Sequence, residues 1–258
     1  NTLGANAWVC IHHLASDDYI RNFAAFFLEH LRPDVKLTVE HSNEVWSNGF
    51  PQGRFAHAEG VRMGLHEDGT PCVSFGYCAR LRYHAKRSVE IFELFKEVWG
   101  ETNRHRLTFV LATQSVVPFV TEELLSWQDT YQHVDVIATT GYFSPTEPID
   151  SSWSVKTPEE VHSALSSGAA AFIAELAAQK EIALRYNIPL TTYEAGPGLV
   201  ERGVIGGGRA TGAVTEALIA AVRDPGMEAI VEQFVQLIQA ADAMSGGSAE
   251  RPLMWYSS

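Results

Sequence analysis

Short apolar runs recur along the chain, and longer segments with apolar residues at helical spacing separate them. The runs contain β-branched and aromatic residues and have the length of buried strands, about four to eight residues. The intervening segments repeat apolar residues every three or four positions, as the buried face of a helix does. The pattern predicts strands at 7–11, 37–39, 107–112, 134–139, 188–193 and 252–256.

Several of the intervening segments carry helix start and stop signals. Ser16 is a candidate N-cap, followed by two acidic residues that favour the positive end of a helix dipole, and Pro33 ends that segment. Thr157 and Glu160 form a capping box with a proline at the first helical position. We expect helices at 17–31, 74–99, 158–186, 211–223 and 225–244, with Gly168 as a candidate break in the third of them. Over 45–73 we expect a long loop, functional or locally structured, because glycine and proline recur there, Gly53 and Gly60 among them.

The alternation of strands and helices predicts an α/β fold with a parallel sheet and right-handed crossovers. Two architectures share this pattern: an open doubly wound sheet and a TIM-type (β/α)8 barrel. Ligands bind at the C-terminal ends of the strands in both. Polar residues gather after the predicted strands, which makes that edge the expected site. They are His12, His13, Asn43, Glu44, Gln114, Tyr142, Glu194 and Trp255.

Composition and charge narrow the classes of function. The chain has 258 residues, of which 46% are hydrophobic and 19% charged, as in ordinary globular proteins. Its net charge of −12 argues against a nucleic-acid partner. No apolar run approaches the ~18 residues of a membrane span, and no signal peptide opens the chain. Three cysteines give no complete disulfide framework, so buried or incidental thiols are expected.

Glu44 and Glu194 are the main chemical signal, because each follows a predicted strand and precedes a loop rich in Gly or Pro. Two carboxyl groups on either side of a glycosidic bond can act as acid and nucleophile. A retaining glycosidase needs them about 5–5.5 Å apart, which opposite positions on a barrel rim can provide. The alternative is that both glutamates make salt bridges or cap helices.

The segment Val39-Glu40-His41-Ser42-Asn43-Glu44-Val45-Trp46 resembles the acid/base strand of clan A glycoside hydrolases, and Thr191-Thr192-Tyr193-Glu194-Ala195-Gly196 is similar to the nucleophile strand of that clan. The first segment is also similar to secreted microbial proteins loosely labelled cellulose-binding. The resemblance implies a TIM-type (β/α)8 barrel in which strands three to eight are present and strands one and two are not seen. It further implies one barrel domain over 1–258, a fragment or an N-terminally truncated chain.

The resemblance also implies roles for single residues. Glu44 would be the general acid and then the base, Asn43 would bind the sugar 2-hydroxyl, and Glu194 would be the nucleophile. Tyr142 could orient Glu194 through its hydroxyl. Trp255 would form a stacking floor for the sugar, and Trp46 would be a platform for the leaving group. His13 would make a polar contact with the substrate. For Tyr142 and these three residues, simple packing remains the alternative, since buried aromatic side chains commonly just pack.

Other patterns leave alternatives open. Glu40 rivals Glu44 for the acid role, because alternation on an undistorted strand puts both on one face; a buried Glu40 would need an Arg or His partner. A metal site would need His13 and His41 to converge with a carboxylate. The basic cluster of the long helix is expected to be a solvated face. That cluster comprises Arg80, Arg82, Lys86 and Arg87.

The sequence therefore predicts a retaining glycoside hydrolase that cleaves a β-linked polysaccharide by double displacement. The alternative is a non-catalytic carbohydrate-binding domain, a degenerate glycosidase. No cofactor or metal is expected. The expected partner is a polysaccharide or oligosaccharide substrate, without nucleic acid or membrane, and the oligomeric state is left open. The expected location is secreted or extracellular.

Overall fold

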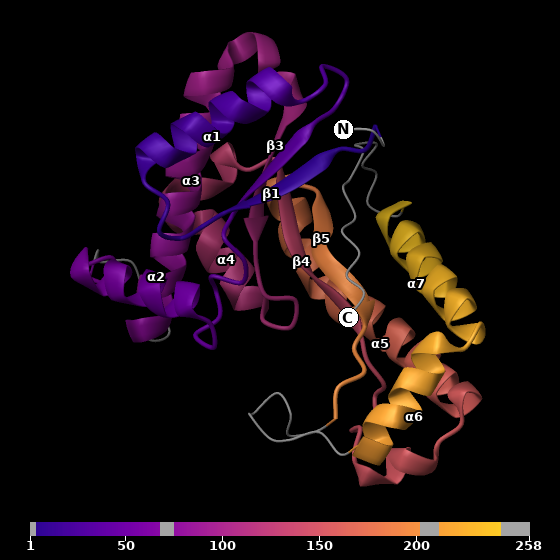
Figure 1. The fold of residues 1–258 in the computed structure, drawn as a ribbon. Coiled ribbons are helices and arrows are strands. Elements are labelled where there is room, and N and C mark those ends of the chain that lie inside the picture. Colours follow the sequence, from indigo (N-terminus) through magenta and orange to yellow (C-terminus); the bar gives the residue numbers. More distant parts are fainter. Residues whose placement is uncertain (1–3, 68–74, 202–211, 244–258) are drawn as a thin grey trace. The chain divides into compact units, whose positions relative to one another are not determined.

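The computed structural model describes residues 4–67, 75–201 and 212–243, and Figure 1 shows its fold. Strands and helices alternate through most of these residues. The strands are β1 Ala7–Ile11, β2 Leu37–His41, β3 Leu107–Ala112, β4 Val136–Phe143 and β5 Leu190–Pro197. The helices are α1 Asp17–His30, α2 Pro51–Arg62, α3 Phe75–Asn103, α4 Pro118–Ser126, α5 Pro158–Tyr186, α6 Gly212–Arg223 and α7 Gly226–Ala243, with short 3₁₀ helices η1 Arg104–Arg106, η2 Trp127–His133 and η3 Ser151–Val155.

The sheet corrects the predicted fold class. Its strands are all parallel and follow the order β1-β2-β3-β4-β5, so each strand lies beside the one before it in the chain. A TIM-type (β/α)8 barrel with strands three to eight is therefore wrong: the described residues hold five strands in an open order. A doubly wound sheet would reverse its strand order, and this one does not. Alternating strands and helices are common to all these folds, which is why the pattern could not choose between them.

Five predicted strands are present, and the sixth, at 252–256, lies outside the described residues. The helix signals also hold. The backbone N–H of Tyr19 donates to Ser16 Oγ at 3.2 Å, and Thr157 and Glu160 exchange the two hydrogen bonds of a capping box. These local devices act over three or four residues, so they can be recognised without knowledge of the tertiary fold.

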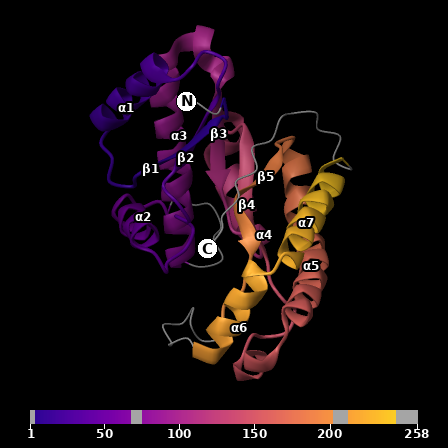
Figure 2. The same cartoon turned by 45° about the vertical axis from the view of Figure 1, so that its right-hand side comes forward.

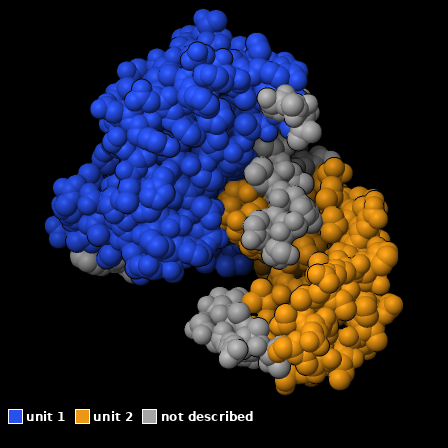
Figure 3. All heavy atoms as spheres, in the orientation of Figure 1, with its two compact units in different colours: residues 1–139, 179–191 blue, residues 140–178, 192–258 orange. Residues whose placement is uncertain are grey.

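The chain divides into two compact units (Figure 3). Unit 1 comprises residues 1–139 and 179–191, and unit 2 comprises residues 140–178 and 192–258. The boundaries fall within β4, α5 and β5. The expectation of one domain over the whole chain stays a prediction.

Helix α3 is the centre of unit 1. It contacts α1, α2 and α4 as well as β2 and β3. Phe92 of α3 stacks on Phe109 of β3 with ring centroids 4.7 Å apart, and the indole of Trp99 donates to the carbonyl of Ala24 in α1 at 3.0 Å. All five residues of β2 are buried. Burial of aromatic and aliphatic side chains around one helix is the main stabilising contribution in this unit.

Helix α2 lies within the segment that was expected to be a loop. The glycines that suggested a loop are packing positions inside the helix. A Cβ on Gly53 would lie 1.7 Å from the carbonyl oxygen of Ser47, and one on Gly60 would lie 2.0 Å from that of Ala79. Only glycine lets the helix approach these backbones so closely.

The basic cluster of α3 is not the solvated face that the sequence suggested. Arg82 is fully buried, and its Nε donates to Glu123 at 2.7 Å while its Nη1 donates to the carbonyl of Leu65 at 2.8 Å. Arg80 is also buried, at 6% exposure. Charge alone cannot show which face of a helix is covered, and here both α2 and α4 pack against α3.

Unit 2 has its own core, in which residues of α5, α6 and α7 pack on the ends of β4 and β5 (Figure 2). Phe143 stacks on Phe234 at 4.3 Å. Gly168, considered as a possible break in α5, lies inside a continuous helix, and a Cβ there would meet the carbonyl oxygen of Ser144 at 1.8 Å.

Of the helices in the described ranges, α5 is long and apolar enough to cross a membrane, judged by length and composition alone. Val161, Leu165, Ala169 and Phe172 of this helix are buried in the core of unit 2. An apolar helix that packs in a protein core has the same composition as a membrane-spanning helix. The composition of α5 by itself therefore does not indicate a membrane partner.

Candidate functional site

One group of candidate residues lies where β2 ends, within unit 1. Ser42 and Glu44 follow the strand, and both have positive φ angles, of 57° and 47°. The backbone N–H of Ser42 still pairs with the carbonyl of Ile11 at 2.7 Å, and that of Ser47 closes a turn on the carbonyl of Glu44 at 2.9 Å. Left-handed backbone in residues other than glycine is uncommon and clusters at functional sites. The turn interrupts the strand alternation that would have put Glu40 and Glu44 on one face.

Glu40 and Glu44 consequently differ in surroundings. Glu40 is 1% exposed, and its Oε2 accepts hydrogen bonds from Trp8 Nε1 at 2.9 Å and Cys10 Sγ at 3.5 Å. The sequence predicted an Arg or His partner for a buried Glu40; an indole and a thiol are among the partners that the structure gives it. Glu44 is half-buried at the strand end. Of the two carboxyl groups, that of Glu44 is the more accessible to a substrate.

The neighbours of Glu44 include two of the predicted substrate contacts. Asn43 is exposed, and its backbone carbonyl accepts a hydrogen bond from Gln52 of α2 at 2.6 Å. Trp46 is half-buried; its indole Nε1 is enclosed and meets no hydrogen-bond acceptor among the described residues. The position of Gln52 was missed because its helix was missed. The roles of Asn43, Glu44 and Trp46 in binding or catalysis stay predictions.

His13 lies after β1, at the same edge of the sheet as Glu44. Its ring is 5.3 Å from Phe55 of α2, in an edge-on arrangement, and 4.2 Å from the ring of His12. Partial burial lowers the pKa of His13, and the neighbouring His12 lowers it further. His13 is therefore biased toward the neutral form, which can both donate and accept a hydrogen bond.

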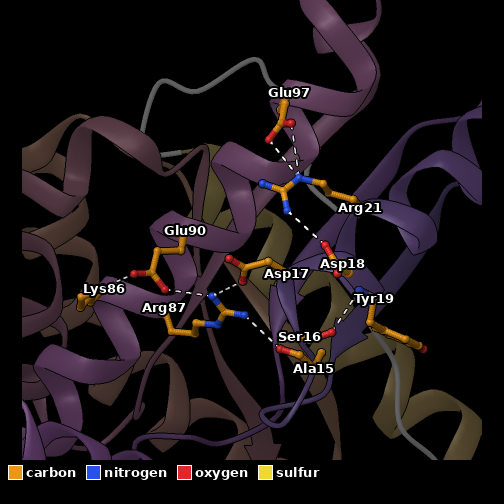
Figure 4. A network of polar contacts seen from close by, with 10 residues as sticks. All are labelled: Ala15, Ser16, Asp17, Asp18, Tyr19, Arg21, Lys86, Arg87, Glu90 and Glu97. Carbon is orange, nitrogen blue, oxygen red and sulfur yellow. Dashed lines mark hydrogen bonds and ion pairs between the residues drawn. The ribbon is translucent and has the colours of Figure 1, made fainter.

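A network of ion pairs fixes the loop that carries His13 (Figure 4). Arg87 of α3 donates to the carbonyl of Ala15 at 3.0 Å, and it pairs with Asp17 and Glu90 at 2.9 Å each. Lys86 also pairs with Glu90. The Arg87 guanidinium thus ties the start of α1 to α3, which anchors the loop after β1 where it enters that helix.

Beneath this strand end, two buried histidines face each other. His41 Nδ1 is 3.0 Å from His84 Nδ1, and His84 Nε2 is 3.2 Å from the carbonyl of Ala112. The carbonyl can only accept, so His84 carries its proton on Nε2 and accepts at Nδ1, and His41 must donate from Nδ1. Burial lowers the pKa of His41 well below its ordinary value and that of His84 to about 4. Both rings are neutral at neutral pH.

This arrangement bears on the metal-dependent alternative, which needed His13 and His41 to converge on a cation. His41 is 1% exposed and uses Nδ1 for His84. Within the ranges that the structure describes, no group of three or more His, Cys, Asp or Glu residues is placed to hold a metal ion. The geometry gives the metal hypothesis no support.

A second group of candidate residues lies on β4 and β5, within unit 2. Phe143 and Ala195 point into the helical core, and by strand alternation Tyr142 and Glu194 lie on the opposite face. The hydroxyl of Tyr142 donates to Glu194 Oε1 at 2.9 Å. This is the contact that the sequence analysis expected between the two side chains. A hydrogen bond to a carboxylate fixes its orientation.

Gly141 allows this contact. A Cβ at Gly141 would lie 2.7 Å from the Cβ of Ala195 and 2.8 Å from the Cγ2 of Thr192. A larger residue would therefore push the two strands apart next to the Tyr142–Glu194 hydrogen bond. The half-buried carboxylate of Glu194 is placed by the strand rather than by a flexible loop.

The predicted site residues thus fall into two groups, and one further residue belongs to neither group. Unit 1 holds His13, Asn43, Glu44 and Trp46, and unit 2 holds Tyr142 and Glu194. Trp255 lies outside the described residues.

Comparison with known proteins adds little. No family model matches the chain, and no curated protein is significantly similar to it. One similar solved structure is a GH26 β-mannanase from Bacteroides ovatus, at 10% identity and a TM-score of 0.31, covering 93% of this chain and 80% of that one. The likeness is a distant one to a glycoside hydrolase, too weak to carry an argument about fold or activity.

Proposed function

We propose that this chain is a retaining glycoside hydrolase that acts on a β-linked polysaccharide, with Glu194 as nucleophile and Glu44 as acid/base. The observation that carries the proposal is the 2.9 Å hydrogen bond from Tyr142 to Glu194. It leaves the second carboxylate oxygen, Oε2, to attack a sugar, and it holds the group on a strand.

The chemistry follows from the two carboxyl groups. Glu194 attacks the anomeric carbon while Glu44 gives its proton to the glycosidic oxygen, which leaves as an alcohol. Glu44, now a carboxylate, then takes a proton from water as that water attacks the same carbon and releases Glu194. Two inversions give retention. Asn43 beside Glu44 offers an amide that can bind a sugar hydroxyl near the reacting carbon.

The proposed location is secreted or extracellular, and the state of the cysteines supports it. Cys78 is disulfide-bonded, which corrects the expectation of buried or incidental thiols for that residue, whereas Cys10 forms no disulfide. Disulfides persist mainly in oxidising compartments. A polysaccharide substrate, which cannot enter a cell, would be met in the same compartment.

The test is chemical rescue of the nucleophile variant. Glu194→Ala should be inactive on an aryl β-glycoside, and added azide should restore release of the phenol and give an α-glycosyl azide. Azide replaces the missing carboxylate in a single displacement, so the product has the inverted configuration. Glu44→Ala with an activated leaving group should give the β-glycosyl azide instead, because Glu194 still forms the covalent intermediate. The exposed Glu175→Ala is the matched control and should behave as the parent chain.

The alternative, a non-catalytic carbohydrate-binding domain, predicts a different set of results. The parent chain would bind glycans without releasing phenol from any activated glycoside, and azide would have no effect on either variant. That outcome would overturn the proposed catalysis. Hydrolysis that survives in Glu194→Ala without azide would equally contradict the role given to Glu194.

A further inference from the structure

Arg80 is a buried cation to which the described residues offer no carboxylate. It lies in the second turn of α3 and is 6% exposed. Its guanidinium carbon is 4.8 Å from the centre of the Tyr77 ring, and its enclosed Nε meets no hydrogen-bond acceptor in the described part of the chain. None of the ion pairs found among those residues involves Arg80. Burying a guanidinium without a carboxylate is costly, so such a group favours an anion from outside.

Arg82, two residues along the same helix, shows what a structural arginine looks like here. It is 0% exposed, and both Glu123 and the carbonyl of Leu65 accept its hydrogen bonds. Residues two apart on a helix point to different faces, and among the described residues only Arg82 of this pair meets a carboxylate. Burial also lowers the pKa of Arg80, and the contact with Tyr77 acts in the opposite direction without reversing that shift.

Gln114 supplies a second set of donors next to Tyr77. The hydroxyl of Tyr77 donates to Gln114 Oε1 at 3.1 Å, which fixes the amide so that its NH2 group points away from the phenol. Gln179 Nε2 donates to the backbone carbonyls of Gln114 and Ser115 at 2.8 Å each, so the segment itself is anchored. Tyr77 therefore contacts two donor groups, the guanidinium of Arg80 and the side-chain amide of Gln114.

These donors lie at the edge of the sheet that carries Glu44. Gln114 follows the last residue of β3 closely, and Glu44 follows β2. The two strands are paired in parallel, with Glu40 beside Val110, so their C-terminal ends are neighbours. Adjacent strands are about 4.8 Å apart, a spacing smaller than one sugar ring and its substituents.

We propose that Arg80 and Gln114 form a subsite for the anionic group of an acidic sugar, a uronate carboxylate or a sulfate ester. The inference rests on the proposed function for the path of the glycan past Glu44. A planar carboxylate matches the two parallel N–H groups of a guanidinium, and a sulfate ester can be bound through the same donors. The substrate would then be an acidic polysaccharide rather than a neutral one.

The test measures binding directly, apart from turnover. Isothermal titration calorimetry on the full chain would compare three β-1,4-linked trisaccharides: cellotriuronate, sulfated cellotriose and neutral cellotriose. Both acidic probes, or one of them, should bind at least about tenfold more tightly than the neutral one, since hydrogen bonds to charged groups contribute that much. The probe that binds more tightly identifies the anionic group. Equal binding of all three, or no binding of the acidic two, would overturn the subsite.

Two variants and one control assign the effect to these residues. Arg80→Gln should lose at least about tenfold in affinity for the acidic probe and keep its affinity for the neutral one. Gln114→Glu keeps an acceptor for Tyr77 and places a negative charge where the amide donors were, so it should lose acidic binding even if Arg80→Gln fails to fold. Arg62→Gln, an exposed arginine paired with Glu59, should change neither affinity. Acidic binding that persists in Gln114→Glu would contradict the subsite.

The outcomes separate this inference from the proposed function. Arg80-dependent binding of acidic glycans without any hydrolysis would keep the subsite and remove the catalysis. Hydrolysis of neutral glycans with no preference for acidic ones would keep the catalysis and remove the subsite.

Discussion

Glu194 lies within β5 and its carboxylate accepts a hydrogen bond from Tyr142, whereas Glu44 lies beyond the end of β2 on a turn with φ of 47°. The first glutamate is oriented by a side chain on the neighbouring strand. The second lies on a turn that is held by the backbone hydrogen bond from Ser47 and by the contact of Gln52 with the carbonyl of Asn43. The two supports respond to different perturbations, and this distinguishes the residues experimentally.

The difference also fits the two proposed roles. A nucleophile must reach one carbon atom along one line, and a strand with a fixed hydrogen bond provides that precision. An acid/base group must act on a leaving oxygen in one step and on a water in the next, and a turn at a strand end gives it access to both. Replacing each carboxylate and each support in turn tests this assignment.

The largest effect is expected from removing the charge of each carboxylate. Glu194→Gln should lower kcat by about 10⁴-fold or more on every substrate, because no intermediate forms. Glu44→Gln should lower kcat by about 10²–10⁴-fold on substrates with poor leaving groups and much less on activated ones, since an activated phenol leaves without a proton. Rates on a series of aryl glycosides measure both. Equal sensitivity to the leaving group in both variants would contradict the assignment.

The next largest effect is expected from acid, which should destabilise the folded chain around the end of β2. The pKa of His84 is about 4 in the folded chain and about 6.5 when unfolded, so only the unfolded chain binds the proton between those values. The free energy of unfolding should therefore fall as pH drops from about 6.5 to 4, by about 3 kcal/mol from His84, with a loss of the same sign from His41. Above pH ~6.5 this contribution is complete. Urea unfolding at about pH 7 and about pH 4.5 measures it.

The control for that measurement is His84→Gln, which can accept from His41 and donate to Ala112 but does not titrate. Its stability should fall less steeply with acid than that of the parent chain. Hydrogen exchange at about pH 5 should rise at Leu37–His41 before it rises at Leu190–Pro197. Parallel loss of protection in both strands, or equal pH slopes in the variant and the parent, would show that the histidine pair is not the cause.

A smaller effect is expected from the hydroxyl that orients Glu194. Tyr142→Phe removes one hydrogen bond to a carboxylate and keeps the ring, so kcat should fall by about tenfold with little change in KM. Tyr193→Phe, one position before Glu194 and on the other face of β5, is the matched aromatic control for the assay. If Tyr142→Phe raised KM and left kcat unchanged, the hydroxyl would contact substrate rather than orient the nucleophile.

The smallest effect is expected at the turn. Gln52→Ala removes an exposed hydrogen bond to the carbonyl of Asn43, so kcat should fall by about threefold. The loss should be of equal size in Glu194→Asp, because the two supports are separate and their effects should add. Steady-state kinetics of the single and double variants measure this. A strongly non-additive result would mean that the two glutamates share a support.

Much of this architecture was predictable because its signals are local. The strand runs, the Ser16 cap and the capping box at Thr157 depend on a few neighbouring residues, and those that lie within the described residues are found where the pattern placed them. The Tyr142–Glu194 contact was expected from the resemblance to clan A glycoside hydrolases. Physical rules for strand and helix ends carry these predictions.

The remainder depends on what packs against what. Gly53 and Gly60 suggested a loop, yet they allow α2 to approach two backbones. Arg82 belongs to a charged cluster, yet it is buried against Glu123. The open strand order, which replaces the predicted barrel, is set by pairing between distant segments. None of these features can be predicted from residues that are close together in the sequence.

The His41–His84 pair gives the molecule an internal reporter. The proton that His41 Nδ1 donates to His84 Nδ1 is buried, so it should exchange slowly with solvent. Such a proton gives a separate far-downfield signal in a nuclear magnetic resonance spectrum. Because His41 is two residues from Asn43 and three from Glu44, that signal would follow, without any label, each event that shifts the end of β2, including the arrival of a glycan.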